Sequence, residues 1–241
     1  MAFPTQESNR RYPGVWIVVP AFNEVTVIDD VIVGLRSAFD NVVCVDDGSS
    51  DGTGEAARRA GAHLVRHPIN LGQGAAIQTG VEYARRQPGA RIFATFDADG
   101  QHRVTDLTRM VARVAANDAD VVIGTRFGGP GTAGEARPPL LKRIVLQIAA
   151  RLSRRGRRLG LTDTNNGLRV FNKKVADELN ITMSGMSHAN EIVVLIAENG
   201  WRVAEEPVEV LYTDYSKSKG QPLLNGVNII FDGFLRGRMP R

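Results

Sequence analysis

Two aspartates stand one residue apart where an apolar run ends in the middle of the chain. Asp97 and Asp99 follow the run at residues 92–96, and Gly100 and Gln101 come next. Side chains alternate along an extended strand, so the two carboxylates point the same way, and the glycine permits a turn that returns the amide oxygen of Gln101. Mg²⁺ and Mn²⁺ prefer such oxygens and usually share them with the phosphates of a substrate. The segment therefore predicts a divalent-metal site formed by Asp97, Asp99 and Gln101.

Two other interpretations compete for this acidic segment. A calcium loop of the EF-hand type is excluded by spacing, because a loop starting at Asp97 puts His102 at the glycine position and Thr108 at the position of the bidentate glutamate. A solvated turn at the end of a strand uses the same residue types and stays open on these residues alone. The neighbouring polar segments favour the metal site.

A second acidic pair follows another apolar run. Asp46 and Asp47 come directly after residues 42–45, where a carboxylate can accept a hydrogen bond from a nucleobase N–H or a ribose hydroxyl. A capping turn accounts for Asp51 but does not require two further adjacent acids.

A glycine-rich segment, Gly72-Gln73-Gly74, opens the next expected helix. Unpaired N–H groups at a helix start favour an anion. The segment is not a Walker A loop, and it lacks the third glycine of the dinucleotide fingerprint. Close packing of the helix explains the small residues equally well, so both interpretations stay open.

Short β-branched runs alternate with longer periodic stretches, which predicts an α/β protein with a mainly parallel, Rossmann-like sheet and helices on both faces. The expected strands cover residues 15–20, 42–45, 63–66, 92–96, 121–124 and 168–172, with an extended piece at 201–211. The expected helices cover about 24–37, with Asn23 as N-cap, then 52–60, 74–86, 105–116 and 188–199. Ligands of such sheets bind at the carboxyl ends of the strands, so the polar segments should converge on one rim.

Composition limits the compartment and the partners. The 241 residues carry a formal net charge of +4 and one cysteine, Cys44, which excludes an internal disulfide and disfavours a structural zinc site. No segment approaches the roughly 20 apolar residues that cross a bilayer, and the start of the chain does not resemble a signal peptide. We expect a cytoplasmic protein.

Two basic amphipathic segments are expected in the second half, at residues 139–161 and 222–241. Each combines apolar side chains at helical spacing with arginines. Such helices can lie on an anionic membrane surface, or they can pack on the core as most amphipathic helices do. No aromatic platform or recognised binding motif accompanies the arginines, so we expect no nucleic-acid partner.

Four ordered motifs resemble the family-2 glycosyltransferases, and most closely their polyprenyl-phosphate (dolichol-phosphate) sugar synthase branch. They are the segments 19–24, 45–53, 70–74 and 96–102, and the likeness continues through 124–126, 163–169 and 205–208. The resemblance implies a GT-A fold. We expect this domain over residues 1–211, with a donor half at about 15–126, an acceptor half at about 127–211 and a basic, amphipathic tail at 212–241.

The resemblance also implies an inverting, metal-dependent transfer from a nucleotide sugar, with the following roles. The donor would be held by Pro20, Ala21, Asn23, Glu24, Asp46, Asp47, Gly72, Gln73, Asp97 and Ala98. Metal ligands would be Asp97, Asp99 and Gln101, and catalytic residues Asp99, Arg126, Asp163 and Glu191. Acceptor phosphates would be bound by Arg126, Arg169, Ser216, Lys217 and Lys219. Two departures are Gln73, where many relatives have lysine, and Asn166, where they often have serine.

Three functional hypotheses follow. The first is transfer from a GDP- or UDP-sugar to a polyprenyl phosphate at the inner membrane face, with peripheral membrane contact and room for a separate membrane partner protein. A lipid monophosphate is largely ionised at neutral pH and needs no strong base. The second is the same chemistry on a saccharide or other hydroxyl acceptor in cell-envelope glycan synthesis, which needs a base such as Asp163 or Glu191. The third is a catalytically silent module that holds lipid or nucleic acid through its arginines.

Overall fold

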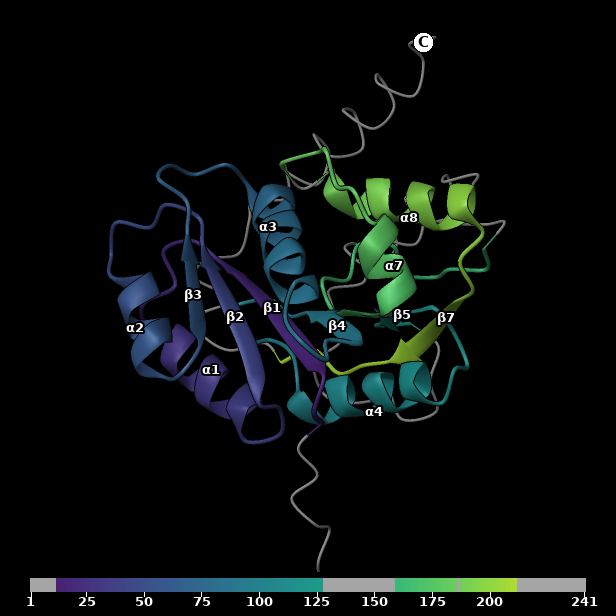
Figure 1. The fold of residues 1–241 in the computed structure, drawn as a ribbon, viewed down its shortest axis with the longest axis horizontal. Helices are drawn as coiled ribbons and strands as arrows, with labels where there is room; N and C mark the ends of the chain where they lie inside the picture. Colours follow the sequence, from purple (N-terminus) through teal and green to yellow (C-terminus); the bar gives the residue numbers. More distant parts are fainter. Residues whose placement is uncertain (1–11, 128–158, 186, 212–241) are drawn as a thin grey trace, which may run out of the picture.

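A seven-stranded mixed sheet organises the part of the chain that the computed structural model describes, residues 12–127, 159–185 and 187–211 (Figure 1). The strands are β1 (Val15–Ala21), β2 (Asn41–Asp46), β3 (His63–Arg66), β4 (Ile92–Thr95), β5 (Val121–Thr125), β6 (Arg169–Asn172) and β7 (Val203–Pro207). Their order in the sheet is β3-β2-β1-β4-β6-β5-β7. Neighbours are parallel except for the two pairs that contain β6.

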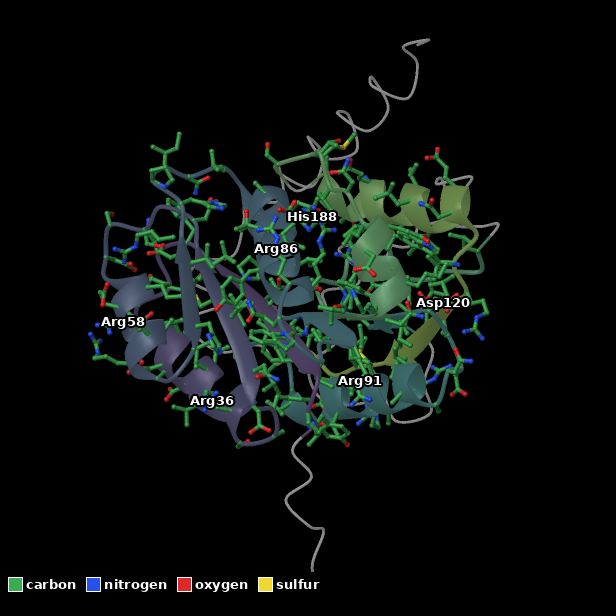
Figure 2. All side chains as sticks on the ribbon, in the orientation of Figure 1. Arg36, Arg58, Arg86, Arg91, Asp120 and His188 are labelled. Atoms are coloured by element: carbon green, nitrogen blue, oxygen red, sulfur yellow. The ribbon has the colours of Figure 1, made fainter. Side chains whose placement is uncertain are left out.

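Helices cover both faces of this sheet (Figure 1), and side chains of the strands and helices fill the space between them (Figure 2). One face packs against α1 (Ile28–Arg36), α2 (Thr53–Arg59) and α4 (Val104–Ala115), and the other against α3 (Gln73–Arg85), α7 (Lys173–Glu178) and α8 (His188–Asn199). Successive side chains of a strand point to opposite faces, so Val18 and Val19 of β1 lie in different cores, both fully buried. The predicted sheet with helices on both faces is confirmed.

The reversed direction of β6 decides which segments meet. The carboxyl ends of β1, β2, β4 and β5 lie at one edge of the sheet, and Thr95, the last residue of β4, pairs with Arg169, the first residue of β6. The segment before β6 therefore reaches the same rim as the acidic loop after β4. A sequence pattern cannot supply this contact, because strand direction is set by pairing across the sheet.

Two sequence predictions need correction. Helix α1 begins at Ile28 with Val27 as its N-cap, and Asn23 is not the cap. Asn23 adopts a left-handed backbone (φ 54°), and its side-chain oxygen accepts a hydrogen bond from the N–H of Ser50, so it joins two loops instead. The expected extended piece at 201–211 is a strand only over β7, followed by a bridge between His102 and Val210.

Helix α7 was not predicted; the side chain of Asn172 caps it by accepting a hydrogen bond from the N–H of Val175. Within the described residues, no helix has the length and hydropathy needed to span a bilayer. Most of the expected amphipathic segment 139–161 and all of the tail at 212–241, including Ser216, Lys217 and Lys219, lie outside these residues.

Candidate functional site

The loops that follow β1 and β2 are bound to each other at the carboxyl rim. The N–H of Asn23 donates to Oγ of Ser49 at 3.0 Å, and the N–H of Glu24 donates to Oγ1 of Thr53 at 2.8 Å. At the end of β1, next to Pro20, the carbonyl oxygen of Ala21 accepts a hydrogen bond from the N–H of Asp47 at 2.8 Å. The predicted donor-binding segments of the first two strands thus form one surface.

The acidic pair after β2 organises neighbouring loops. Asp46 is fully buried and accepts hydrogen bonds from the N–H of Ser49 and from Nε of Arg66. Asp47 accepts hydrogen bonds from the N–H groups of Leu71 and Gly72, at 2.9 and 2.8 Å. These contacts fix the loop between β3 and α3 at the rim.

His67 is a further member of this loop that the sequence analysis did not select. It is buried, with Nδ1 2.7 Å from Oδ1 of Asp47 and Nε2 2.9 Å from Oγ1 of Thr79. The only sequence signal was a histidine at the end of an expected strand, which does not distinguish a surface residue from a buried one. In the structure its ring contacts the same carboxylate of Asp47 that accepts the hydrogen bonds from Leu71 and Gly72.

The glycines at the start of α3 are explained by packing. The N–H of Gly74 donates to the carbonyl oxygen of Ser184 at 2.7 Å. A Cβ on Gly72 would overlap the carbonyl oxygen of Ser184, and a Cβ on Gly74 that of Met183. Of the two interpretations left open by the sequence, close packing is therefore the one that the structure supports for these residues.

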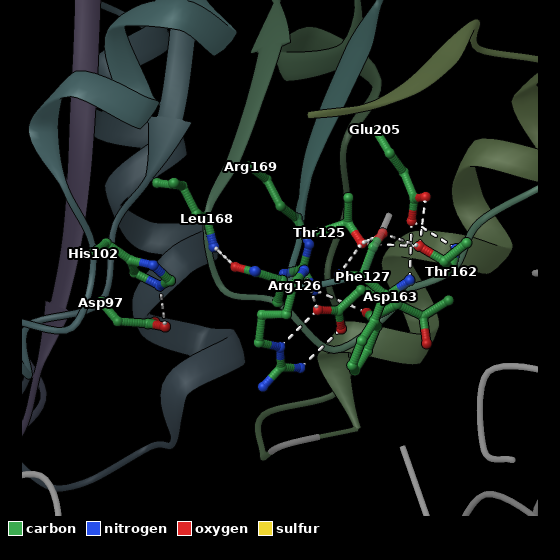
Figure 3. A network of polar contacts seen from close by, with 12 residues as sticks. Asp97, His102, Thr125, Arg126, Phe127, Thr162, Asp163, Leu168, Arg169 and Glu205 are labelled. Carbon is green, nitrogen blue, oxygen red and sulfur yellow. Dashed lines mark hydrogen bonds and ion pairs between the residues drawn. The ribbon is translucent and has the colours of Figure 1, made fainter. Parts of the chain in front are cut away.

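Asp97 is held from two sides beyond β4. Its Oδ1 accepts a hydrogen bond from Nε2 of Gln73 at 2.9 Å, and its Oδ2 lies 3.2 Å from Nε2 of His102 (Figure 3). Burial alone would raise the pKa of Asp97, but the hydrogen bond from His102 and the charges of His102 and Arg169 lower it. Asp97 is therefore an ionised carboxylate in a fixed orientation. The adjacent Ala98 is buried in the core.

Asp99 lies where negative charge is concentrated. The turn at Gly100 (φ 72°) lets Oδ1 of Asp99 accept a hydrogen bond from the N–H of Gln101 at 3.0 Å. Burial, and then the charges of Asp97 and Glu24, raise the pKa of Asp99 to about 6. A cation would relieve this repulsion. Carboxylate oxygens can accept more than one interaction, so the contacts already made do not prevent coordination.

These residues fit a divalent cation that is shared with a substrate. Among the described residues, no group of three or more His, Cys, Asp or Glu side chains is arranged to hold a metal by itself. Mg²⁺ is commonly bound through one or two carboxylates, with water and substrate phosphates completing its shell. Two aspartates at a loop rim match that pattern better than they match a closed structural site.

On the other side of the rim, Arg126 and Asp163 form a bidentate ion pair. Nε and Nη2 of Arg126 donate to Oδ2 and Oδ1 of Asp163 at 2.7 and 2.8 Å, and the backbone N–H of Arg126 donates to Oδ2 at 3.2 Å (Figure 3). The side chain of Asp163 is 2% exposed and that of Arg126 is 19% exposed. The buried Asp163 therefore orients the partly exposed side chain of Arg126.

Arg169 lies inside the protein, between the pair formed by Asp97 and His102 and the pair formed by Arg126 and Asp163 (Figure 3). It is 1% exposed, and its Nη2 donates to the carbonyl oxygen of Thr164 at 3.3 Å. Burial lowers its pKa to about 10, against the opposing effect of the charges of Asp97 and Asp163. This position makes Arg169 an internal counter-ion between the two halves of the rim.

Glu191 of α8 binds the loop that precedes its own helix. Its carboxylate accepts hydrogen bonds from the N–H and the hydroxyl of Thr182 and from the N–H of Met183, the last at 2.8 Å. That loop packs on the start of α3, where the carbonyl oxygen of Ser184 accepts the hydrogen bond from Gly74. The structure gives its carboxylate three donors.

Comparisons with known proteins agree with this architecture. The family described as Glycosyl transferase family 2 matches residues 16–179. An uncharacterised protein of Methanocaldococcus jannaschii is 33% identical over 90% of this chain and 89% of its own length. The UDP-N-acetylglucosamine–dolichyl-phosphate N-acetylglucosaminyltransferase of Methanococcus voltae is 26% identical, over 90% of this chain and 93% of its own.

Two further comparisons cover most of the chain. The polyprenol monophosphomannose synthase of Mycolicibacterium smegmatis is 26% identical over 93% of this chain and 88% of its own length. The crystal structure of glucosyl-3-phosphoglycerate synthase from Mycobacterium tuberculosis, in complex with Mn²⁺, UDP and glucosyl-3-phosphoglycerate, superposes with a TM-score of 0.69 at 17% identity. It covers 91% of this chain and 76% of that one. The predicted GT-A fold is confirmed.

Proposed function

The chain belongs to glycosyl transferase family 2, and from this membership and the geometry of its rim we propose that it transfers a sugar from a nucleotide-diphosphate sugar to a polyprenyl phosphate. The relatives from Methanococcus voltae and Mycolicibacterium smegmatis, which match almost over their full lengths, are named for dolichyl and polyprenol phosphates. That likeness supports the acceptor class. GDP- and UDP-sugars are the donor classes to be tested.

The hydrogen bonds made by the two candidate bases, Asp163 and Glu191, are the observation that favours one class of acceptor over the other. Asp163 is engaged by three donors of Arg126, and Glu191 by three donors of Thr182 and Met183. The oxygens of both carboxylates are therefore already taken up by donors of the protein, and neither can receive a proton from an acceptor hydroxyl without giving up one of these hydrogen bonds. A hydroxyl acceptor would need a base, whereas a phosphate monoester arrives largely ionised. This arrangement favours the phosphate acceptor.

The donor is held by the first half of the rim. The loops at Asn23, Glu24 and Asp47 would contact the nucleoside, and Asp99, with Asp97 and Gln101, would hold a divalent cation. When bound, the cation offsets the charge that develops on the departing nucleoside diphosphate. Residues at about 15–126 would form this donor half, and residues at about 127–211 the acceptor half.

Residues of the chain perform the remaining tasks. Arg126, oriented by Asp163, faces the phosphates and stabilises their charge. Arg169 places a positive charge beside Asp97 and Asp163 from inside the protein, and this charge favours the ionised form of Asp97. The acceptor oxygen attacks the anomeric carbon from the side opposite the leaving diphosphate, so the configuration inverts. The arginine-rich segments 139–161 and 222–241 would contact the membrane that carries the lipid acceptor, at its cytoplasmic face.

The test is transfer of labelled sugar from GDP- and UDP-sugars to a polyprenyl phosphate in detergent, with Mg²⁺ or Mn²⁺. We expect an acid-labile product that extracts into organic solvent and is absent with Asp99→Ala. Transfer to saccharide acceptors only, with no extractable product from any donor, would contradict the lipid-phosphate acceptor.

A further inference from the structure

A carboxylate on the strand next to β5 organises the loop that holds Arg126. Oε1 of Glu205 accepts hydrogen bonds from the N–H groups of Thr162 and Asp163, at 2.7 and 2.9 Å. Its Oε2 accepts one from the hydroxyl of Thr162 at 2.8 Å. Figure 3 shows this fan of contacts beside the ion pair of Arg126 and Asp163. One side chain of β7 therefore binds two consecutive residues of the segment that orients the arginine.

The same loop is bound to the end of β5 by a second contact. Oγ1 of Thr162 lies 2.8 Å from Oγ1 of Thr125, the residue immediately before Arg126. The hydroxyl of Thr162 donates to Glu205, so Thr125 is the donor of this contact, and Oγ1 of Thr125 in turn accepts a hydrogen bond from the N–H of Phe127 at 3.0 Å. The backbone on both sides of Arg126 is thus fixed by hydroxyls, and the hydroxyl of Thr162 is in turn fixed by Glu205.

Strand geometry gives this site a matched control. Glu205 and Glu206 are consecutive residues of β7, which pairs in parallel with β5, so their side chains point to opposite faces of the sheet. Glu206 faces α4, where it accepts from Nε of Arg109 and from Nη1 of Arg113, each at 3.2 Å. Within the described residues, its carboxylate forms ion pairs with α4 and no hydrogen bond to Thr162 or Asp163.

We infer that Glu205 is a positioning residue for sugar transfer, acting on Arg126 through Thr162 and Asp163. The inference rests on the proposed function, because that function places Arg126 against the reacting phosphates. A carboxylate only accepts hydrogen bonds, and three donors of one turn converge on this one. Without it, these donors must find other partners, and the carboxylate of Asp163 no longer has a fixed position from which to orient the guanidinium.

The expected effect is on the chemical step. Displacement of a charge-stabilising group by about 1 Å can lower a rate on the order of 100-fold. For Glu205→Ala we expect kcat for transfer to fall about 10- to 100-fold while KM for the donor changes much less, since the donor loops lie on other strands. Glu205→Gln retains a carbonyl oxygen for the two N–H groups and should recover most of the rate. Glu206→Ala should lower the melting temperature without changing kcat.

A second measurement reads the position of Arg126 without any substrate. In protein labelled with ¹⁵N-arginine, the Nε–H signal of Arg126, assigned by its loss in Arg126→Lys, should be slow to exchange because Asp163 accepts this hydrogen. Glu205→Ala should shift the signal and speed its exchange, and Glu206→Ala should leave it unchanged. Thr162→Val removes the hydroxyl that joins Glu205 to Thr125 but keeps the two N–H groups bound to Glu205. It should cause a smaller change in the same direction, and it replaces Glu205→Ala if that variant does not fold.

The two measurements separate this inference from the proposed function. An Arg126 signal and a kcat that are the same in wild type, Glu205→Ala and Thr162→Val would overturn the positioning role even if the wild type is fully active. A displaced Arg126 signal in Glu205→Ala, together with a wild type that transfers no sugar, would support the coupling and refute the proposed reaction.

Discussion

Substitution of Gly167 by alanine should displace Asp97 selectively. Gly167 lies in the segment before β6, where a Cβ would overlap the carboxylate oxygens of Asp97. That carboxylate cannot simply rotate away, because Gln73 and His102 hold its two oxygens. The added methyl group must therefore break at least one of these contacts or push the segment before β6 away from the acidic loop.

The cost can be estimated from these contacts. Overpacking by one methyl group costs about 1–3 kcal/mol, and loss of one hydrogen bond to a charged group costs about 1.5–3 kcal/mol. Because these terms overlap, we expect Gly167→Ala to lower the free energy of unfolding by about 2–4 kcal/mol. In a protein of this size that corresponds to roughly 5–15 °C in melting temperature.

The assay compares Gly167→Ala with Gly185→Ala, whose Cβ would meet no atom of the described residues within 4 Å and whose backbone is not left-handed. Melting is followed with and without a nucleoside diphosphate and Mn²⁺. We expect Gly185→Ala to match the wild type in both conditions, and Gly167→Ala to melt lower and to lose most of the ligand-induced shift. A Gly167→Ala protein with the stability and ligand response of the wild type would refute the placement of Asp97 against this segment.

Three further predictions concern other contacts. Gln73→Ala removes one hydrogen bond to ionised Asp97, so denaturant unfolding should show a loss of about 1.5–3 kcal/mol; an unchanged midpoint would contradict that contact. Hydrogen bonds from Arg202 lower the pKa of Asp120 to about 2, so this carboxylate stabilises the fold above its unfolded pKa near 4, and the benefit disappears as pH falls through about 2. The free energy of unfolding of Asp120→Asn should therefore be lower than that of the wild type at pH 7, and this difference should be largely lost at pH 2. An equal difference in the free energy of unfolding at both pH values would contradict the ion pair. Chelation of divalent metals should abolish stabilisation by a nucleoside diphosphate, which at 100 times its Kd amounts to about 2.7 kcal/mol with metal present; a shift that survives chelation would contradict a metal-bound diphosphate.

Sequence reasoning located the strands because their composition is local information. The runs that became β1, β2 and β4 are apolar and β-branched, and each ends in the polar residues found at the rim, so the approach of Asp47 and Asp97 to one edge followed from parallel pairing. The helix of residues 188–199 was also readable, because Gly200 ends it with a left-handed backbone. Regular periodicity and turn residues were sufficient for these elements.

Contacts between distant segments were not readable in the same way. Arg126 and Asp163 are 37 residues apart, and nothing local indicates that one is the partner of the other. The burial of Arg169 depends on the reversed strand β6, which places a charged residue in the interior. Asn23 looked like a helix cap because asparagine favours that position, but it also tolerates a left-handed backbone, and here tertiary contacts selected the second property.

Location of Mn²⁺ by anomalous diffraction, in crystals grown with Mn²⁺ and a nucleoside diphosphate, tests the metal-assisted transfer most directly. We predict one strong peak coordinated by the carboxylate of Asp99 and by the diphosphate, with the guanidinium of Arg126 facing the same phosphates. A manganese peak remote from Asp99, or a nucleotide bound away from the carboxyl rim of the sheet, would contradict the proposed site.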